Sequence, residues 1–419
     1  MLRIAVNATL AGLIITVVSA AFAMAQSELA ARPPITVLAV GDVMLGSSFP
    51  DESGLPPDDG VDLLQEVTPI LQEGDIVFGN LEGPLVDDGT TKKCGGRLAN
   101  AGASPAPTRH PKHRKSGKRT IPKPVNCYAF RVPTRYGQYL KTAGFTVMSL
   151  ANNHALDFGQ EGRASSRHVL DSLGIAHSGE VGDIAHLTVG STRVAVIAFA
   201  TYPASYNFLD LDDAIDTVRA ARAEADIVIV SFHGGAEGST HQHVAPGDER
   251  FVGEDRGDLR RFAHAMIDNG AQLVIGSGPH VVRAMEVYCG HLIAYSLGNF
   301  ATYGSFNLAA ENGISLILEV RLAPDGAFLG GQVYPVKQEK PGGPHLDPDL
   351  AILPVLRSLS AADFPSTHID VGPLGELSAP SPASRPCEYP WDYIDYLFPR
   401  VPCGIFSYRP CNTLPGCRL

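Results

Sequence analysis

Six short apolar runs in this chain each end at a polar residue that can bind a metal ion or move a proton. The residues at or just after these ends are Asp42, Asn80, Glu82, Asn152, Asn153, His154, His233, His280 and Asn299. Short, β-branched apolar runs are typical of buried strands, and in open α/β sheets ligands bind beyond the carboxyl ends of the strands. If the runs share one core, we expect these side chains to converge on one rim, as a metal site or for acid–base chemistry.

The first residues have the form of an export signal. Arg3 precedes a mostly apolar stretch from Ile4 to Ala25, and Ala23-Met24-Ala25 has the small-x-small form of a cleavage site. We therefore expect a signal peptide at residues 1–25 and a secreted or periplasmic mature protein. An uncleaved N-terminal membrane anchor is the alternative, because the apolar run is near the lower limit for spanning a bilayer.

Charge is unevenly distributed along the chain. The net charge of −11 argues against nucleic-acid binding. Residues 91–126 nevertheless contain no acidic residue and many lysines and arginines, and they lack the apolar residues needed to form a core. We expect a basic, disordered insertion there, closed at its base by a disulfide between Cys94 and Cys127.

The other five of the seven cysteines divide into a cluster and one isolated residue. Cys387, Cys403, Cys411 and Cys417 lie close together near the end of the chain, where an exported protein is expected to form disulfides. The sequence leaves their pairing open, and zinc is the alternative, although no CxxC spacing occurs. Cys289 stands apart between two strand-like runs, so we expect a buried free thiol.

The order of apolar patterns predicts a mixed α/β fold. After a linker at 26–34, a domain at 35–340 is expected, followed by a proline-rich, cysteine-containing irregular tail at 341–419. Helical patterns at 61–71, 133–143, 159–173, 212–223 and 255–269 alternate with strand-like runs. Strand patterns then follow one another at 282–288, 291–297, 313–321 and 328–336. Two sheets packed face to face, with helices outside, satisfy both halves.

Asn152-Asn153-His154 is the most informative of the polar strand ends. Three consecutive polar residues after an apolar run are costly to bury without partners. Asp157, three residues after His154, is placed to orient the imidazole and fix its tautomer, as a general acid or a ligand requires. The alternative is a network that caps the helix expected at 159–173.

The remaining strand ends allow structural as well as functional interpretations. Asp42 and Glu82 also suit a turn and a cap, respectively. The glycines of His233-Gly234-Gly235-Ala236-Glu237 allow close approach of a ligand, and those before His280 place it beside a metal or phosphate or merely permit a tight bend. His241 and His243 lie in a loop-like segment, and we interpret them as surface residues.

The chain resembles the CapA family of capsule and poly-γ-glutamate synthesis proteins, relatives of calcineurin-type metallophosphoesterases. The matching segments stand in family order: residues 41–46 (GDVMLG), 79–82 (GNLE), 130–133 (FRVP), 151–159 (ANNHALDFG), 233–237 (HGGAE), 276–281 (GSGPHV), 286–288 (EVY) and 295–300 (YSLGNF). The resemblance implies a four-layer α/β/β/α sandwich.

The resemblance also implies a site, with departures from the family pattern. The family often has His-Trp-Gly at 233–235 and His-His-Pro-His at 277–280, and the metallophosphoesterases have Asp-x-His where this chain has Asp42 without a histidine. One divalent ion (Mn, Fe or Zn) is therefore expected, held by some of Asp42, Glu82, Asn153, His233 and His280. Substrate contacts are expected from Asn80, Asn152, Arg131, Glu237, Glu286 and Asn299.

Two functions fit this sequence. In the first, an enzyme uses the metal to hydrolyse an anionic phosphoester or γ-linked glutamate polymer, with His154 as general acid, Asp157 steadying it, and the basic insertion attracting substrate. In the second, the same rim binds an anionic envelope polymer without turnover, alongside membrane-bound synthesis or export proteins. The missing histidines favour the second function, and the retained Asn153, His154 and Asp157 favour the first.

Overall fold

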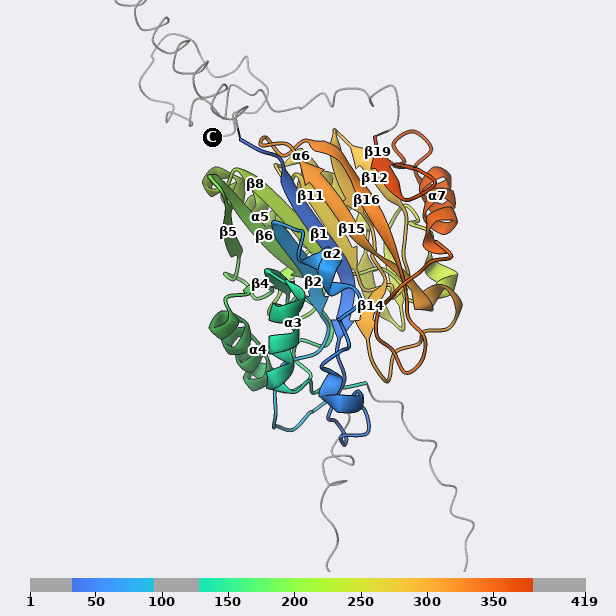
Figure 1. Ribbon diagram of the computed structural model, residues 1–419. Helices are drawn as coiled ribbons and strands as arrows, with labels where there is room; N and C mark the ends of the chain where they lie inside the picture. The colour runs from blue at the N-terminus through green and yellow to red at the C-terminus, as the bar shows by residue number, and fades with distance from the viewer. Residues whose placement is uncertain (1–31, 94–127, 380–419) are drawn as a thin grey trace, which may run out of the picture. The chain divides into compact units, whose positions relative to one another are not determined.

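Two β-sheets form the centre of the protein, whose computed structural model describes residues 32–93 and 128–379 (Figure 1). The first sheet has the order β18-β19-β16-β15-β1-β2-β3-β4, with β14 beside β1 and β17 beside β16. Its strands are β1 (Ile35–Met44), β2 (Ile76–Leu81), β3 (Val147–Ser149), β4 (Ala176–Ser178), β14 (Asn299–Thr302), β15 (Ile314–Leu322), β16 (Phe328–Lys337), β17 (His345–Leu346), β18 (Asp370–Val371) and β19 (Glu376–Ser378).

The second sheet has the order β12-β13-β11-β8-β6-β5, with β7 beside β6. Its strands are β5 (Ala185–Val189), β6 (Thr192–Ala200), β7 (Tyr206–Asn207), β8 (Ile227–His233), β11 (Leu273–Ser277), β12 (Met285–Tyr288) and β13 (His291–Ala294). A separate hairpin pairs β9 (Glu249–Phe251) with β10 (Glu254–Gly257). The parallel pairs β1–β2, β2–β3, β6–β8 and β8–β11 bring strand ends from each sheet to a common edge.

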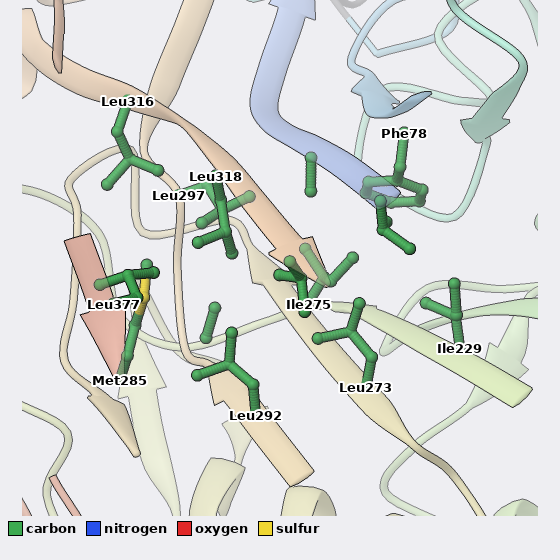
Figure 2. Packing of buried hydrophobic residues seen from close by; sticks show 14 of the residues in the cluster. Phe78, Ile229, Leu273, Ile275, Met285, Leu292, Leu297, Leu316, Leu318 and Leu377 are labelled. Carbon is green, nitrogen blue, oxygen red and sulfur yellow. The ribbon is translucent and has the colours of Figure 1, made fainter. Parts of the chain in front are cut away.

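The alternation of side chains along the strands creates four layers. One face of each sheet meets the other sheet in an apolar core that includes Phe78, Ile229, Ile275 and Leu318 (Figure 2). The outer face of the first sheet packs against α2 (Thr68–Leu71), α3 (Gly137–Ala143) and α4 (Gly159–Leu173), and that of the second against α5 (Leu211–Glu224) and α6 (Leu259–Asp268). The α/β/β/α sandwich expected from the sequence is confirmed.

Most predicted helices occur where their patterns lie, with one exception. The helix α4 spans the predicted residues 159–173, and α5 and α6 differ from prediction only at their ends. Residues 61–71 do not form one helix but a series of turns followed by the short α2. Pro69 lacks an N–H and cannot donate to the carbonyl four residues earlier, which explains why a continuous helix does not form there.

The domain boundary expected at residue 340 is wrong. Residues 341–379 add α7 (Ile352–Asp363), whose apolar face enters the core between the sheets through Ile352, Leu353 and Leu356. They also add β18 and β19, which extend the first sheet beside β16. The prolines of this segment lie mostly between short helices and strands, and they do not mark an irregular tail. The domain therefore continues at least to residue 379.

Cys289 corrects a second expectation. It is disulfide-bonded and partly exposed, in the turn between β12 and β13 with a φ of 53°, so it is not a buried free thiol. The predicted signal peptide, the Cys94–Cys127 disulfide, most of the basic insertion and the tail cysteines lie outside the described residues. Among the described residues, no helix is long and apolar enough to cross a membrane.

The edge strand β4 is held by a histidine between two carboxylates, which predicts a pH-dependent stability. His177 Nδ1 lies 2.9 Å from Asp183 Oδ2, and Nε2 lies 3.2 Å from Asp171 Oδ1. Burial opposes the charged ring, but the two aspartates outweigh it and raise the pKa of His177 above its ordinary value of 6.5. The stabilisation is therefore complete below about pH 6.5 and is lost as the pH rises through the folded-state pKa.

We expect His177→Gln to lower the free energy of unfolding by up to about 1 kcal/mol at about pH 5.5, and by less at about pH 9. Urea denaturation of both proteins at the two pH values measures this difference. The exposed His186 on β5 provides a matched control, His186→Gln, which should show no such pH dependence. A loss of stability in His177→Gln that is the same at both pH values would refute the ion-pair explanation.

Candidate functional site

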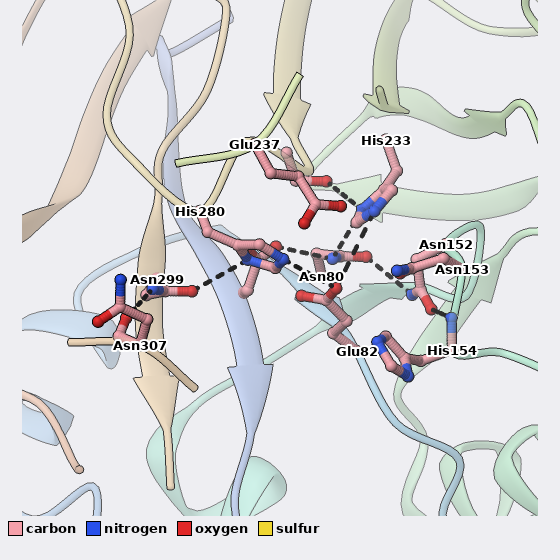
Figure 3. A network of polar contacts seen from close by, with 12 residues as sticks. Asn80, Glu82, Asn152, Asn153, His154, His233, Glu237, His280, Asn299 and Asn307 are labelled. Carbon is pink, nitrogen blue, oxygen red and sulfur yellow. Dashed lines mark hydrogen bonds and ion pairs between the residues drawn. The ribbon is translucent and has the colours of Figure 1, made fainter. Parts of the chain in front are cut away.

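The polar residues at the strand ends lie together where the carboxyl ends of the parallel strands in the two sheets face each other (Figure 3). The first sheet contributes residues from β1, β2 and the turn after β3, and the second contributes residues from β8 and the turn after β11. We call this set the rim cluster: Asp42, Asn80, Glu82, Asn152, Asn153, His154, His233 and His280. The convergence predicted from the six apolar runs is thus present in the structure.

Asp42 forms the centre of one side of the rim cluster. Its register partner in β2 is Asn80, whose Nδ2 donates to Asp42 Oδ1 at 2.9 Å. His280 Nδ1 lies 2.9 Å from Asp42 Oδ2 and 3.1 Å from Asn299 Oδ1. Since both partners are acceptors, Nδ1 of His280 carries a proton. Asp42 is fully buried in a strand, so the interpretation of Gly41-Asp42 as a simple turn is wrong.

Glu82 is the least satisfied residue of the rim cluster. It follows β2 directly, and it is fully buried. Among the described residues, neither of its carboxylate oxygens has a hydrogen-bond partner. Oε1 lies 3.7 Å from His280 Nε2 and 4.0 Å from His233 Nε2, which is beyond hydrogen-bonding distance. Glu82 therefore caps no turn. Its Oε1 instead faces the Nε2 atoms of His280 and His233 without bonding to either.

His233, the last residue of β8, is oriented by its neighbour Ser277 in β11. The Ser277 hydroxyl lies 3.2 Å from both His233 Nδ1 and the Phe232 carbonyl oxygen. The hydroxyl can donate to that carbonyl and accept from Nδ1, which leaves Nε2 with a free lone pair; in the other tautomer Nδ1 accepts from the Asn80 amide, 3.4 Å away. Nε2 is buried and has no partner among the described residues. His233 and Asp42 are neighbours, because Asn80 Nδ2 also lies 3.4 Å from His233 Nδ1.

The turn after β3 connects His154 to the rest of the rim cluster. Asn152 donates through Nδ2 to Asn80 Oδ1 at 3.0 Å, and its Oδ1 accepts from the His154 backbone N–H at 3.0 Å. His154 Nδ1 lies 2.7 Å from Asp157 Oδ2, the contact expected from their spacing. The alternative of a helix-capping network is wrong, because the N-cap of α4 is Phe158 and no side chain caps it.

Burial and neighbouring charges set opposite pKa directions within the rim cluster. Burial, and then the Asp42 carboxylate, raise the pKa of Glu82 well above its usual range. Burial lowers the pKa of His154, with Asp157 opposing it, and burial lowers the pKa of His233 well below its usual value. Burial also opposes the charge on His280, but Glu82 and Asp42 outweigh it and raise the pKa to about 10. The cluster thus places the two acidic side chains, Asp42 and Glu82, against the His280 imidazole.

The donor set fits a divalent cation. Ligand atoms of Asp42, Glu82 and His280 all lie within 4.8 Å of one another. Besides the two oxygens of Glu82 and Nε2 of His233, the buried Oδ1 of Asn153 has no partner among the described residues. Carboxylate and amide oxygens with imidazole nitrogens suit Mn, Fe or Zn. An ion of this kind would give the orphaned atoms the partner that the protein does not supply.

Glu237 is held beside the rim cluster by a clamp of buried ion pairs. Its Oε1 accepts from Nη2 of the buried Arg256 at 2.9 Å, and Arg256 Nε donates to the Gly235 carbonyl at 2.9 Å. Glu249 accepts from the Ala236 backbone N–H at 2.7 Å and pairs with the buried Arg283 at 2.7 Å. Figure 3 shows the Glu237 side chain between His233 and His280. The β9–β10 hairpin thus fixes the loop after β8.

Two glycines account together for the two sequence departures at 233–235 and 277–280. A Cβ on Gly278, which has a φ of +111°, would lie 2.8 Å from the Gly234 carbonyl oxygen. A Cβ on Gly234 would lie 2.4 Å from the Phe208 ring. Neither position has room for a tryptophan or a histidine without a shift of the backbone or of Phe208. The loops after β8 and β11 have therefore closed on each other where larger side chains were expected.

Two predicted substrate-binding residues make their contacts elsewhere. Arg131 donates to the hydroxyl and carbonyl oxygens of Ser48 and lies over the rings of Phe49 and Phe158. Glu286 lies in β12 and accepts from His264 at 2.6 Å, Tyr295 at 2.8 Å and Thr367 at 2.5 Å.

The placement of Glu286 away from the rim cluster has a structural reason. Glu286 lies within an antiparallel strand and not at the carboxyl end of a parallel one, so the strand-end rule does not apply to it. Asn299 differs from both, because it contacts the rim cluster through His280. His241 is partly exposed and His243 is exposed, as expected for surface residues.

Several residues that support the rim cluster were not among those predicted from the sequence. Phe130 donates its backbone N–H to Asp157 Oδ2 at 2.8 Å, and its ring lies 4.3 Å from that of His154. Lys93 lies against the same histidine, and Ser277 orients His233. Arg256 and Glu249 come from the hairpin. Each is remote in sequence from its partner, and only the FRVP motif around Phe130 and the GSGPHV motif around Ser277 gave a signal.

The chain is similar to proteins of bacterial capsule synthesis. Residues 114–303 match the family model described as bacterial capsule synthesis protein PGA_cap. The PGA biosynthesis protein CapA of Bacillus subtilis is 29% identical over 278 residues, which are 62% of this chain and 61% of that protein. The capsule biosynthesis protein CapA of Bacillus anthracis is 27% identical over 289 residues, 64% of this chain and 59% of that protein. The chain thus spans about six tenths of the length of these relatives.

Solved structures are less similar. A 5′-nucleotidase precursor from Thermus thermophilus aligns with 80% of this chain and 59% of its own at 12% identity and a TM-score of 0.39, which is too low to support conclusions about chemistry. The similarity to capsule synthesis proteins instead comes from the sequences, through the family model and the two relatives. In these matches, the chain is similar to the CapA proteins of bacterial capsule synthesis.

Proposed function

We propose that this protein is exported and acts in the synthesis or export of an anionic envelope polymer of the poly-γ-glutamate type, through a divalent metal site resembling that of the metallophosphoesterases. Its relatives include a PGA biosynthesis protein and a capsule biosynthesis protein. The observation that carries the metal site is the group of buried, unpartnered ligand atoms of Glu82, Asn153 and His233 beside the Asp42–His280 pair. Buried polar atoms without partners are rare in folded proteins.

Asp42, Glu82, Asn153, His233 and His280 would hold the ion. When bound, a divalent ion of this kind supplies Lewis acidity and lowers the pKa of a bound water. Asp157 holds the Nδ1 proton of His154, so Nε2 is the nitrogen available to transfer a proton. Asn80 and Asn152 use their amides to fix Asp42 and His154, and we assign them to holding the site together.

The substrate of a hydrolysis at this metal site would be a phosphoester or an anionic polymer. A bound cation would attract such groups. Glu237 would repel them, but its charge is paired with Arg256. The partners would be the polymer itself and membrane-bound synthesis or export proteins. The signal-like start of the chain supports export to the compartment in which envelope polymers are assembled.

A non-catalytic polymer-binding or assembly factor is the second candidate. The observation that favours it is that Ser277 and Gly278 stand where the family often has two histidines, and the Gly278 position has no room for one. A site with fewer imidazoles can bind an ion that anchors a carboxylate polymer without activating water. Metal content and turnover of a generic phosphoester, measured on the same preparation, separate the two candidates.

The first test of the proposal is metal binding. We expect Mn²⁺ at about 100 times its Kd to stabilise the mature protein by ~2.7 kcal/mol, or about 4 °C in Tm for a domain of this size. Glu82→Gln and His233→Ala should each abolish this gain, because each removes a ligand atom that has no other partner. Thermal unfolding and calorimetric titration measure the effect, and the exposed His186→Ala is the matched control.

The apo proteins provide a further check on the same residue. An unpartnered buried acceptor costs about 1–3 kcal/mol, so metal-free Glu82→Gln should be no less stable than the metal-free wild type. A wild-type protein that gains no stability from Mn²⁺, Fe²⁺ or Zn²⁺ would refute the metal site. A large loss of apo stability in Glu82→Gln would instead indicate a structural role for Glu82.

The second test separates His154 from the ligands. If the protein hydrolyses a generic phosphoester, His154→Asn should lower kcat about 100-fold or more while leaving metal affinity unchanged, because proton transfer is lost and the ligands remain. Steady-state kinetics and metal titration on the same variant measure both quantities. His168→Asn, on the exposed face of α4, is the control. Loss of metal binding in His154→Asn would assign His154 as a ligand.

A further inference from the structure

Lys93 brings one ammonium group to the polar turn after β3. Its Nζ lies 2.8 Å from Asp157 Oδ1, 3.1 Å from the Asn153 carbonyl oxygen and 3.2 Å from His154 Nδ1. Sixty-one residues separate it from His154 along the chain. Its side chain is 38% exposed, whereas that of Asp157 is 1% exposed, so the ion pair has one end in solvent and one end buried.

Lys93 completes the set of hydrogen bonds around the Asp157 carboxylate. Oδ2 accepts from His154 Nδ1 at 2.7 Å and from the Phe130 backbone N–H at 2.8 Å, and Oδ1 accepts from Lys93. An ammonium donates and never accepts, so the Nδ1 proton of His154 goes to Asp157. With both oxygens bonded, the carboxylate plane is fixed, and the imidazole that it holds is fixed too.

The same ammonium also fixes the main chain of Asn153. It is bound to the Asn153 carbonyl oxygen, while the side-chain Oδ1 of Asn153 is buried without a partner among the described residues. A ligand atom without other contacts depends on its backbone for its position. Lys93 therefore holds both the residue we propose as a metal ligand and the residue we propose for proton transfer.

We propose that Lys93 is a positioning residue of this site, which fixes Asn153 directly and His154 through Asp157. This inference deepens the proposed function, and it rests on that function for the roles of Asn153 as a metal ligand and of His154 in proton transfer. An ordinary surface ion pair would contribute ~0–1 kcal/mol and affect nothing else. If Lys93 is a positioning residue, its loss changes the accessibility of His154 and the metal affinity at Asn153, while the stability of the protein stays the same.

Site-resolved chemical labelling tests the inference without relying on turnover. Diethyl pyrocarbonate modifies accessible imidazoles, and mass mapping of the full-length mature protein resolves each histidine. We expect His154 to be protected in the wild type. In Lys93→Met it should be labelled about tenfold faster, because Asp157, which holds the ring, is no longer fixed by the ammonium group. Lys93→Arg, which keeps the donors, should restore protection. Lys92→Met removes an exposed neighbouring lysine and should behave as wild type.

Metal titration of the same variants provides the second measurement. Lys93→Met should weaken Mn²⁺ binding about tenfold, the usual effect of losing an outer contact to a ligand. The partly buried His291 reports on general loosening, since it lies in β13 and its ring bonds to the Gly326 carbonyl, away from Lys93. If the wild type binds no metal, the proposed function fails, while labelling of His154 still reports on Lys93. Labelling of His154 that is equal in Lys93→Met and Lys92→Met, or that rises together with His291, would overturn the inference.

Discussion

A buried carboxylate without a partner is the constraint on which the rest of this site depends. Glu82 is fully buried, and the fold places another buried carboxylate, Asp42, close enough to raise its pKa. Such an arrangement is unfavourable for folding by itself, at about 1–3 kcal/mol for each unsatisfied group. Asn80 and Asn152 are uncharged, and burial holds the pKa of His233 well below its usual value. Only His280 in the rim cluster, 2.9 Å from Asp42 and 3.7 Å from Glu82, faces the two carboxylates with a raised pKa, and one imidazole cannot offset both. The arrangement is consistent with a resident cation.

The site depends on the packing of the two sheets against each other. Asp42, Asn80 and Glu82 come from the first sheet, whereas His233 and His280 come from the second. Their separation is therefore set by the apolar core between the sheets, which α7 helps to close. The loop after β8 is further fixed by the Arg256 and Glu249 pairs of the hairpin. A rigid scaffold of this kind can hold ligand atoms apart without direct contacts between them.

Sequence reasoning located residues whose positions follow from sheet geometry. Asp42, Asn80, His233 and His280 stand at or just after the carboxyl ends of parallel strands, and that local property is visible as an apolar run with a polar end. The layers could be predicted for the same reason. Lys93 and Arg256 could not, because their contacts are made across long sequence separations by side chains with no periodic signal. The boundary at 340 failed because prolines were weighed above the apolar spacing of α7.

Glu82 and Glu286 show why burial alone does not identify a functional carboxylate. They are 0% and 1% exposed, respectively, and both were expected at the site. Glu286 receives hydrogen bonds from His264, Tyr295 and Thr367, so its charge is compensated within the fold. It joins β12 to α6, to the residue that follows β13 and to the segment after α7. Glu82 receives none from the described residues. The number of donors around a buried acid, which sequence does not encode locally, therefore separates a structural carboxylate from one that requires a ligand.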